Sequence, residues 1–190
     1  GGDGCGLGAP GRAVRILYLA PVDLSRAGGQ AVHVRRICMA LEGAGHEVRL
    51  LAHRPAREHS WAGPDGGLVL AGGPVAGQVP RLRHLASEWA LARALRRESR
   101  HFRPDVLLVR QEAFSVAPWL AGLTWRPRPV PLVVESNSSL PAVAASAGAS
   151  PARVARLASW EGRLLRVADS VGAVTAALAS RHAREYGVAV

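Results

Sequence analysis

The sequence contains no lysine, and all 24 of its basic residues are arginine. A P-loop of the form GxxxxGK[ST] needs a lysine that reaches the nucleotide phosphates, so this absence excludes an ATPase or GTPase of that class. The chain is also rich in alanine, glycine and proline, a bias typical of GC-rich coding. We therefore interpret the net charge of +10 as a general attraction to anions and predict no specific nucleic-acid site.

Cysteine is scarce, with only Cys5 and Cys38. One lies in a glycine-rich tail and the other in a predicted helix, so neither a disulfide framework nor a paired-cysteine metal site is available. His46, His53 and His59 lack carboxylate or cysteine partners at ligand spacing, and we predict no metal site. No apolar run approaches the ~20 residues that span a bilayer, and the first residues lack the apolar core of a secretory signal. We therefore expect a cytoplasmic protein.

The length of 190 residues suits one domain of ordinary size. A hydrophobic content of 48% with 20% charged residues indicates a globular fold. Residues 1–13 are glycine-rich and aperiodic, so we expect a disordered leader followed by a folded domain over residues 14–190. Glycines in the leader formally match GxGxxG, but no predicted strand precedes them, and we predict no dinucleotide loop there.

Short apolar runs alternate with helical patterns along the folded part. We expect strands at residues 14–20, 47–53, 67–71, 105–110, 130–135 and 170–175. We expect a loop at residues 21–30 and helices at 31–43, 82–95, 113–123, 151–168 and 176–186. In the second helix, steps of three and four predict a sheet-facing stripe made of Leu82, Leu85, Trp89, Ala92 and Leu95. The alternation predicts an α/β fold with a doubly wound, Rossmann-like parallel sheet.

Ligands of such a fold bind beyond the carboxyl ends of the strands, which directs attention to the first loop. Gly28 and Gly29 stand just before a helix whose N-terminus offers free N–H groups and a partial positive charge. The pair fits an anion-binding turn and an ordinary tight turn equally well. His33 lies about 100° around the helix from its apolar stripe, where it faces either a cleft or solvent.

Polar side chains also follow the fourth and fifth predicted strands. Gln111 and Glu112 end the fourth strand, and Glu135, Asn137 and two serines end the fifth. Carboxylates and amides both suit hydroxyl-rich ligands, although polar residues end most strands. These two loops are therefore candidates for orienting a polar substrate.

Glu161 interrupts the apolar face of the predicted helix at residues 151–168. Because an unpaired buried carboxylate is costly, we expect a buried structural glutamate with a hydrogen-bonding partner. The opposite face of the same helix carries an aromatic and basic set: Arg153, Arg156, Trp160 and Arg163. That face suits a membrane surface, an anionic partner or plain solvent.

Five segments follow one another in a recognisable order. The first two are RILYLAPVD and GGQAVHVRRICMALEGAGHEVRLLA, followed by PDVLLVRQE, PLVVESNSS and WEGRLLRVADSVGAVTAALASRHAREYGV. Each segment is similar to one part of the same known domain. In order, these parts are its opening strand, its GG loop with the following helix and GHEV strand, its fourth strand, its fifth strand ending in Glu-x-Asn, and its glutamate-bearing helix with the sixth strand. From Arg15 to Val188 the sequence thus resembles the N-terminal domain of family 4 glycosyltransferases.

The resemblance implies the acceptor-side half of a GT-B enzyme that moves a sugar from a nucleotide-sugar donor to an acceptor, usually with retention and without a metal or other cofactor. It places Gly28 and Gly29 near the donor phosphates. It places on the acceptor side Gln30, His33, Gln111, Glu135 and Asn137. The donor-binding half would follow residue 190, so we expect a truncated protein or a piece of a longer one that is inactive alone. Peripheral contact with the inner membrane face is a further expectation.

Two other functions stay open. A Rossmann-like module without catalysis would bind or regulate a partner. A nucleotide-dependent epimerase or dehydrogenase needs GxGxxG directly after the first strand and an acidic residue at the end of the second. This chain has Ala20-Pro21-Val22-Asp23 and His53 at those places, which departs from that fingerprint.

Overall fold

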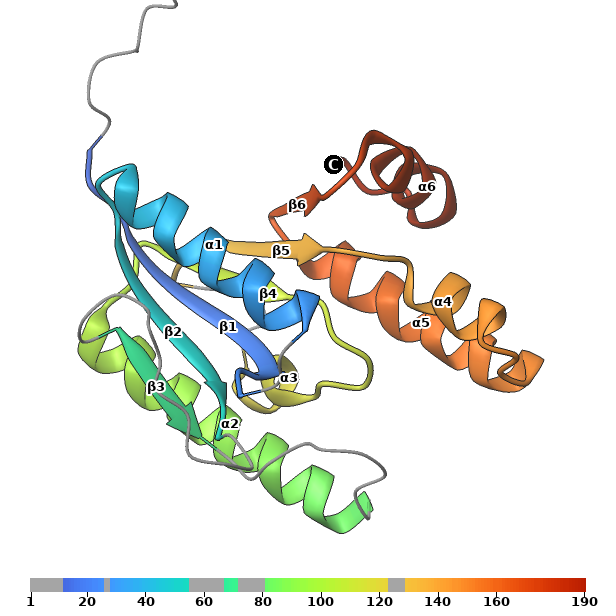
Figure 1. Ribbon diagram of the computed structural model, residues 1–190, viewed down its shortest axis with the longest axis horizontal. Helices are drawn as coiled ribbons and strands as arrows, with labels where there is room; N and C mark the ends of the chain where they lie inside the picture. Colours follow the sequence, from blue (N-terminus) through green and yellow to red (C-terminus); the bar gives the residue numbers. More distant parts are fainter. Residues whose placement is uncertain (1–11, 26–27, 55–66, 72–80, 123–128) are drawn as a thin grey trace, which may run out of the picture.

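The computed structural model describes residues 12–25, 28–54, 67–71, 81–122 and 129–190, so most of the expected leader lies outside the described residues. In these ranges six parallel strands form one sheet in the order β3-β2-β1-β4-β5-β6 (Figure 1). The strands are β1 (Arg15–Asp23), β2 (Glu47–His53), β3 (Leu68–Ala71), β4 (Val106–Arg110), β5 (Leu132–Ser136) and β6 (Ser170–Ala173). The helices are α1 (Gly29–Gly43), α2 (Arg81–Phe102), α3 (Ala117–Leu120), α4 (Leu140–Ser146), α5 (Pro151–Val167) and α6 (Ala176–Tyr186). The predicted doubly wound α/β fold is confirmed.

The strand order reverses between β1 and β4, which is the switch point where ligands of doubly wound sheets bind. β1 is central and its side chains alternate between two apolar cores. Leu17 and Leu19 pack with α2, α3 and α5, whereas Tyr18 and Ala20 pack under α1. Burial on both faces explains why this strand reads as a continuous apolar run.

Several element boundaries differ from the sequence prediction, and two of the differences change the carboxyl edge of the sheet. β1 continues to Asp23 instead of ending at residue 20, because an irregularity after Ala20 lets Asp23 pair with His53 of β2. The helix expected at residues 113–123 is reduced to α3. Phe114 has a positive φ of 58°, which a right-handed helix cannot contain, so the residues before α3 form turns instead.

α4 was missed by the sequence analysis. It is short, and the backbone N–H of Leu140 at its start donates to the buried carboxylate of Glu161, 2.8 Å away. Pro141 lies in its first turn, where a missing N–H costs nothing. Its stability therefore depends on a residue 21 positions away in α5, and the local signals were Pro141 and Ser139 at the N-cap.

The stripe predicted for α2 is wrong over its first half. Leu82, Leu85 and Trp89 are 81%, 52% and 51% exposed, while Ala92 and Leu95 are buried as expected. Ser87 and Glu88 are the buried residues of these first turns. Figure 1 shows the reason: the N-terminal turns of α2 run past the carboxyl end of β2, so none of the six described strands lies beneath them.

Glu161 joins four segments on the α5 side of the sheet and is 0% exposed. It accepts hydrogen bonds from Gln111 Nε2, from Leu140 N and from Tyr186 Oη, the last at 2.6 Å. Gly162 makes the tyrosine contact possible, because a Cβ there would lie 2.8 Å from the Tyr186 ring. The carboxylate thus holds β4, α4, α5 and α6 together.

Replacing Glu161 with glutamine should destabilise the fold. The amide group would turn an acceptor into a donor that faces other donors, at a cost of about 1–3 kcal/mol in the free energy of unfolding. Urea denaturation of Glu161→Gln measures this loss. The exposed Glu185→Gln is the matched control and should stay near wild type; equal midpoints for the two variants would contradict the assigned role.

Candidate functional site

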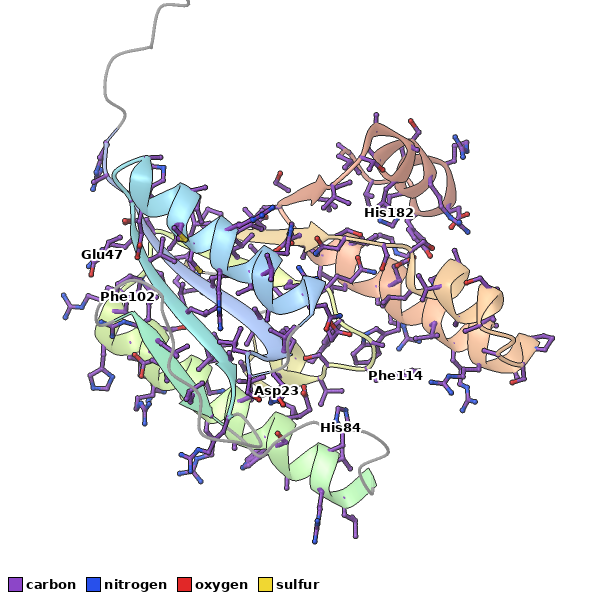
Figure 2. All side chains as sticks on the ribbon, in the orientation of Figure 1. Asp23, Glu47, His84, Phe102, Phe114 and His182 are labelled. Carbon is purple, nitrogen blue, oxygen red and sulfur yellow. The ribbon has the colours of Figure 1, made fainter. Side chains whose placement is uncertain are left out.

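A cavity of about 540 Å³ opens at the carboxyl ends of β1 and β2. Its volume lies in the range of small-molecule sites. The lining residues come from β1 and its loop, α1, β2, α2 and the loop before α3: Pro21, Val22, Asp23, Gly28, Gly29, Gln30, Ala31, His53, His84, Glu88, Glu112, Ala113 and Ser115. Figure 2 labels Asp23 and His84 at this end of the sheet, with Glu47 at the opposite end of β2.

The GG loop lines the cavity at the N-terminus of α1. Gly28 is the N-cap with an extended backbone (φ −168°) that any residue adopts, and Gly29 begins the helix. A Cβ on either glycine would meet no atom within 4 Å. Neither the backbone nor packing therefore requires glycine, and the missing side chains leave the helix N-terminus open to the cavity. No acidic residue in the first turn and no capping side chain neutralises that N-terminus.

Glu88 is the most enclosed carboxylate of the cavity wall, at 1% exposed. It accepts hydrogen bonds from Ser115 Oγ and Ala117 N, each at 2.9 Å, and its Oε1 lies 3.5 Å from His53 Nε2. Burial by itself raises the pKa of Glu88, but these partners outweigh it and hold the pKa below its ordinary value. The group is therefore an anchored anion that fixes His53 and the start of α3.

Glu112 is held more loosely. Its oxygens lie 3.4 Å from Ala113 N and 3.5 Å from Gln30 Nε2. Burial raises the pKa of its carboxyl, and the neighbouring Glu88 adds to the increase. Asp23, by contrast, is occupied by the hydroxyl and backbone N–H of Ser25, at 2.6 and 3.0 Å. Of these three acidic side chains, Glu112 has the greatest capacity left for a ligand.

A second polar cluster lies under α1, next to the cavity, and centres on Glu135. Its carboxylate contacts His33 Nε2 at 2.6 Å, Arg110 Nη1 at 2.9 Å and Asn137 Nδ2 at 2.6 Å, and it accepts the Tyr18 hydroxyl. Burial and the adjacent carboxylate raise the pKa of Tyr18, so the phenol keeps its proton. This cluster ties the first turns of α1 to β1, β4 and β5.

The residues singled out from the sequence fall into three groups. Gly28, Gly29 and Gln30 line the cavity. His33, Glu135 and Asn137 form the neighbouring cluster and do not line the cavity. Gln111 also stays away from the cavity, because its amide donates to Glu161 on the α5 side.

Four titratable residues line the cavity that the sequence did not indicate as part of a site: Asp23, His53, His84 and Glu88. His84 and Glu88 are four residues apart and so share one helical face, which was the available signal. The predicted stripe instead places Leu82, Leu85 and Trp89 of α2 against the sheet.

Among residues 12–25, 28–54, 67–71, 81–122 and 129–190, no group of three or more histidine, cysteine, aspartate and glutamate side chains is arranged to hold a metal ion. Within the same ranges no helix combines the length and apolarity that crossing a membrane requires.

Removing the charge of Glu88 should make the free energy of unfolding less dependent on pH in the acid range. Because the folded state lowers its pKa, Glu88 stabilises the fold above its unfolded pKa of about 4.3 and loses that contribution as the pH falls through the folded value. Urea denaturation should show Glu88→Gln less stable by about 1–3 kcal/mol at neutral pH, with a gap that closes below about pH 4. The exposed Glu47→Gln is the control, and a gap independent of pH would contradict the assignment.

Solved structures share this fold. Sucrose-phosphate synthase from Thermosynechococcus elongatus superposes with a TM-score of 0.64 at 17% sequence identity, covering 92% of this chain and 45% of that chain. A second structure of the same synthase gives a TM-score of 0.57 at 15% identity, covering 92% of this chain and 83% of that chain. The chain thus spans less than half the length of the first of these structures. No similar sequence was found among curated proteins.

The sequence itself identifies the family. Residues 27–190, which include α1, the GG loop and every later element, match the model of Glycosyltransferase Family 4. The matched segment covers well over half of the 190 residues. The chain therefore belongs to glycosyltransferase family 4.

Proposed function

We propose that this chain is the acceptor-side domain of a glycosyltransferase that transfers a sugar from a nucleotide-sugar donor to an acceptor held in the cavity. The observation that carries the proposal is the cavity itself. It lies at the carboxyl edge of a family 4 domain and combines an open helix N-terminus with a loosely held carboxylate. An anion and a hydroxyl-bearing ligand would each find a matching group there.

The N-terminus of α1 is proposed to face the donor phosphates. Its free N–H groups and partial positive charge favour a phosphate, and the two glycines let that phosphate approach the backbone. No acidic residue of the first turn competes for the same groups. The phosphate role of Gly28 and Gly29 is thus supported by geometry as well as by family membership.

Glu112 and Gln30 are proposed to bind hydroxyl groups of the acceptor. Their side chains approach each other across the cavity from the loop after β4 and from α1. A carboxylate and an amide together accept and donate, which matches a hydroxyl group in both of its roles. Glu88 would act through His53 as a positioning pair, since its own lone pairs are already used.

Transfer itself is proposed to need a second, donor-binding domain. In a GT-B enzyme, donor and acceptor meet between two domains, and electrostatic stabilisation of the departing diphosphate is usually the largest catalytic contribution. Among the described residues that line the cavity, the N-terminus of α1 is the helix N-terminus available for that task. By itself the chain should therefore bind nucleotide sugar weakly and transfer nothing measurable.

Gly29→Ala should weaken nucleotide-sugar binding without weakening the fold. The added methyl group projects into the open space beside the helix N-terminus, where a phosphate would approach. Titration of the labelled chain with UDP-glucose, followed by amide chemical shifts, should show an affinity loss on the order of tenfold. Gly43→Ala at the far end of α1 is the matched control. Unchanged binding by Gly29→Ala would remove the phosphate role from this loop.

A chimera tests the transfer proposal. Fusing the donor domain of a family 4 enzyme after Val190 should produce turnover of a radiolabelled nucleotide sugar with a panel of sugar acceptors, while the unfused chain stays inactive. Turnover by the unfused chain would contradict the two-domain proposal. A folded chimera that binds the donor yet transfers to no acceptor would instead favour a non-catalytic binding module.

A further inference from the structure

The first turns of α2 have their polar and apolar sides reversed. Ser87 and Glu88 face the protein interior, and His84 lines the cavity. Outside, Leu82, Leu85 and Trp89 form an exposed apolar patch on one side of the helix, which we call the α2 tip. Leu82 alone is 81% exposed. A contiguous patch of this kind on an otherwise well-packed domain marks an interaction surface.

The same side of α2 becomes basic beyond the tip. At 100° per residue, Arg93, Arg96 and Arg100 continue the line of Leu82, Leu85 and Trp89, and Arg97 lies beside them. All four arginines are exposed. The two acidic residues of α2, Glu88 and Glu98, are 1% and 6% exposed and so belong to the buried side. The outer face of α2 therefore presents arginine without an exposed carboxylate of the same helix, and Arg97 Nε pairs with the buried Glu98 Oε1 at 3.0 Å.

We propose that the outer face of α2 docks on an anionic lipid membrane. The α2 tip would enter the boundary between headgroups and acyl chains, where Trp89 has the amphipathic ring that this depth favours. Arg93 and Arg100 would lie against lipid phosphates, each contributing to binding at an anionic surface, whereas Arg96 donates to Leu120 O and Arg97 pairs with Glu98. From Leu82 to Arg100 the face is about 27 Å long, sufficient for an apolar insertion next to several phosphate contacts.

The arginine face of α5 is a weaker candidate. Trp160, expected beside those arginines, packs instead against Trp119 and Phe114, with ring centroids 4.5 and 6.3 Å apart. The face thus offers charge without an exposed aromatic anchor. A nucleic acid would use the arginines of α2 but would leave Leu82 and Leu85 without a role, so the apolar tip favours lipid.

Docking would have a positional consequence for the cavity. His84 and Glu88 line the cavity from the turns that carry the α2 tip on their other side. The cavity would then lie roughly one helix diameter, about 10 Å, from the membrane surface. The inference itself does not depend on the proposed function, because lipid binding is measured without a sugar substrate.

Vesicle sedimentation of the purified chain tests the docking surface. The chain should sediment with vesicles of phosphatidylcholine mixed equally with phosphatidylglycerol, and much less with phosphatidylcholine alone. Added salt should release it, since charge attraction is screened. Failure to bind the anionic vesicles at low salt would overturn the proposal.

Two variant pairs separate the apolar and basic contributions. Leu82→Ser with Leu85→Ser should lower the partition coefficient at least about tenfold, because two exposed leucines no longer enter the membrane. The control is Val32→Ser with Met39→Ser. These exposed apolar residues lie on α1, and replacing them should leave vesicle binding unchanged.

The basic contribution is tested by Arg93→Gln with Arg100→Gln, which should also lower the partition coefficient roughly tenfold or more. Arg153→Gln with Arg163→Gln on α5 removes the same charge and should have little effect.

Other outcomes would assign the face differently. Circular dichroism and thermal midpoints should show that every variant is folded, which the exposure of the replaced side chains favours. Equal losses from the α2 and α5 arginine pairs would overturn the specific role of α2. If the chain forms a dimer that Leu82→Ser with Leu85→Ser dissociates, the face is a dimer interface and the membrane proposal is wrong. The proposal is also wrong if the chain binds duplex DNA in place of vesicles.

Discussion

Burial of carboxylates at the carboxyl end of the sheet is the constraint on which this structure depends. Glu88, Glu135 and Glu161 are all buried, and a carboxylate without partners inside a protein is strongly unfavourable. Each is surrounded by donors from several elements. Every one of these carboxylates therefore acts as a junction, and the loops that meet at this edge have little freedom to move apart.

The same constraint shapes the cavity. Glu88 fixes His53 and the start of α3, and Glu135 fixes the first turns of α1 through His33. The anchored groups have few lone pairs left for a ligand. Glu112, which lacks such strong partners, and the open N-terminus of α1 are consequently the places where unused hydrogen-bonding capacity is left for the proposed ligands.

α2 links the cavity to the proposed membrane surface. Helical geometry separates its two sides by half a turn, so His84 and Glu88 serve the cavity while Leu82, Leu85 and Trp89 face outward. Its C-terminal half has the usual arrangement, with Leu91 and Leu95 buried against the sheet. One helix thereby combines a core-packing half with a half whose apolar residues are left for another surface.

The sequence alone determined the fold class and the position of all six strands, because parallel strands buried on both faces appear as local apolar runs such as residues 14–20. It also pointed to the GG loop, since loops after strands carry ligands in this fold. Only the tertiary structure decided which side of α2 faces the sheet. The periodicity of the sequence identifies an apolar face of the helix, but it does not show which element packs against that face. The tertiary structure likewise separated Gln111 from the cavity and formed α4, since both depend on Glu161, which lies far along the chain.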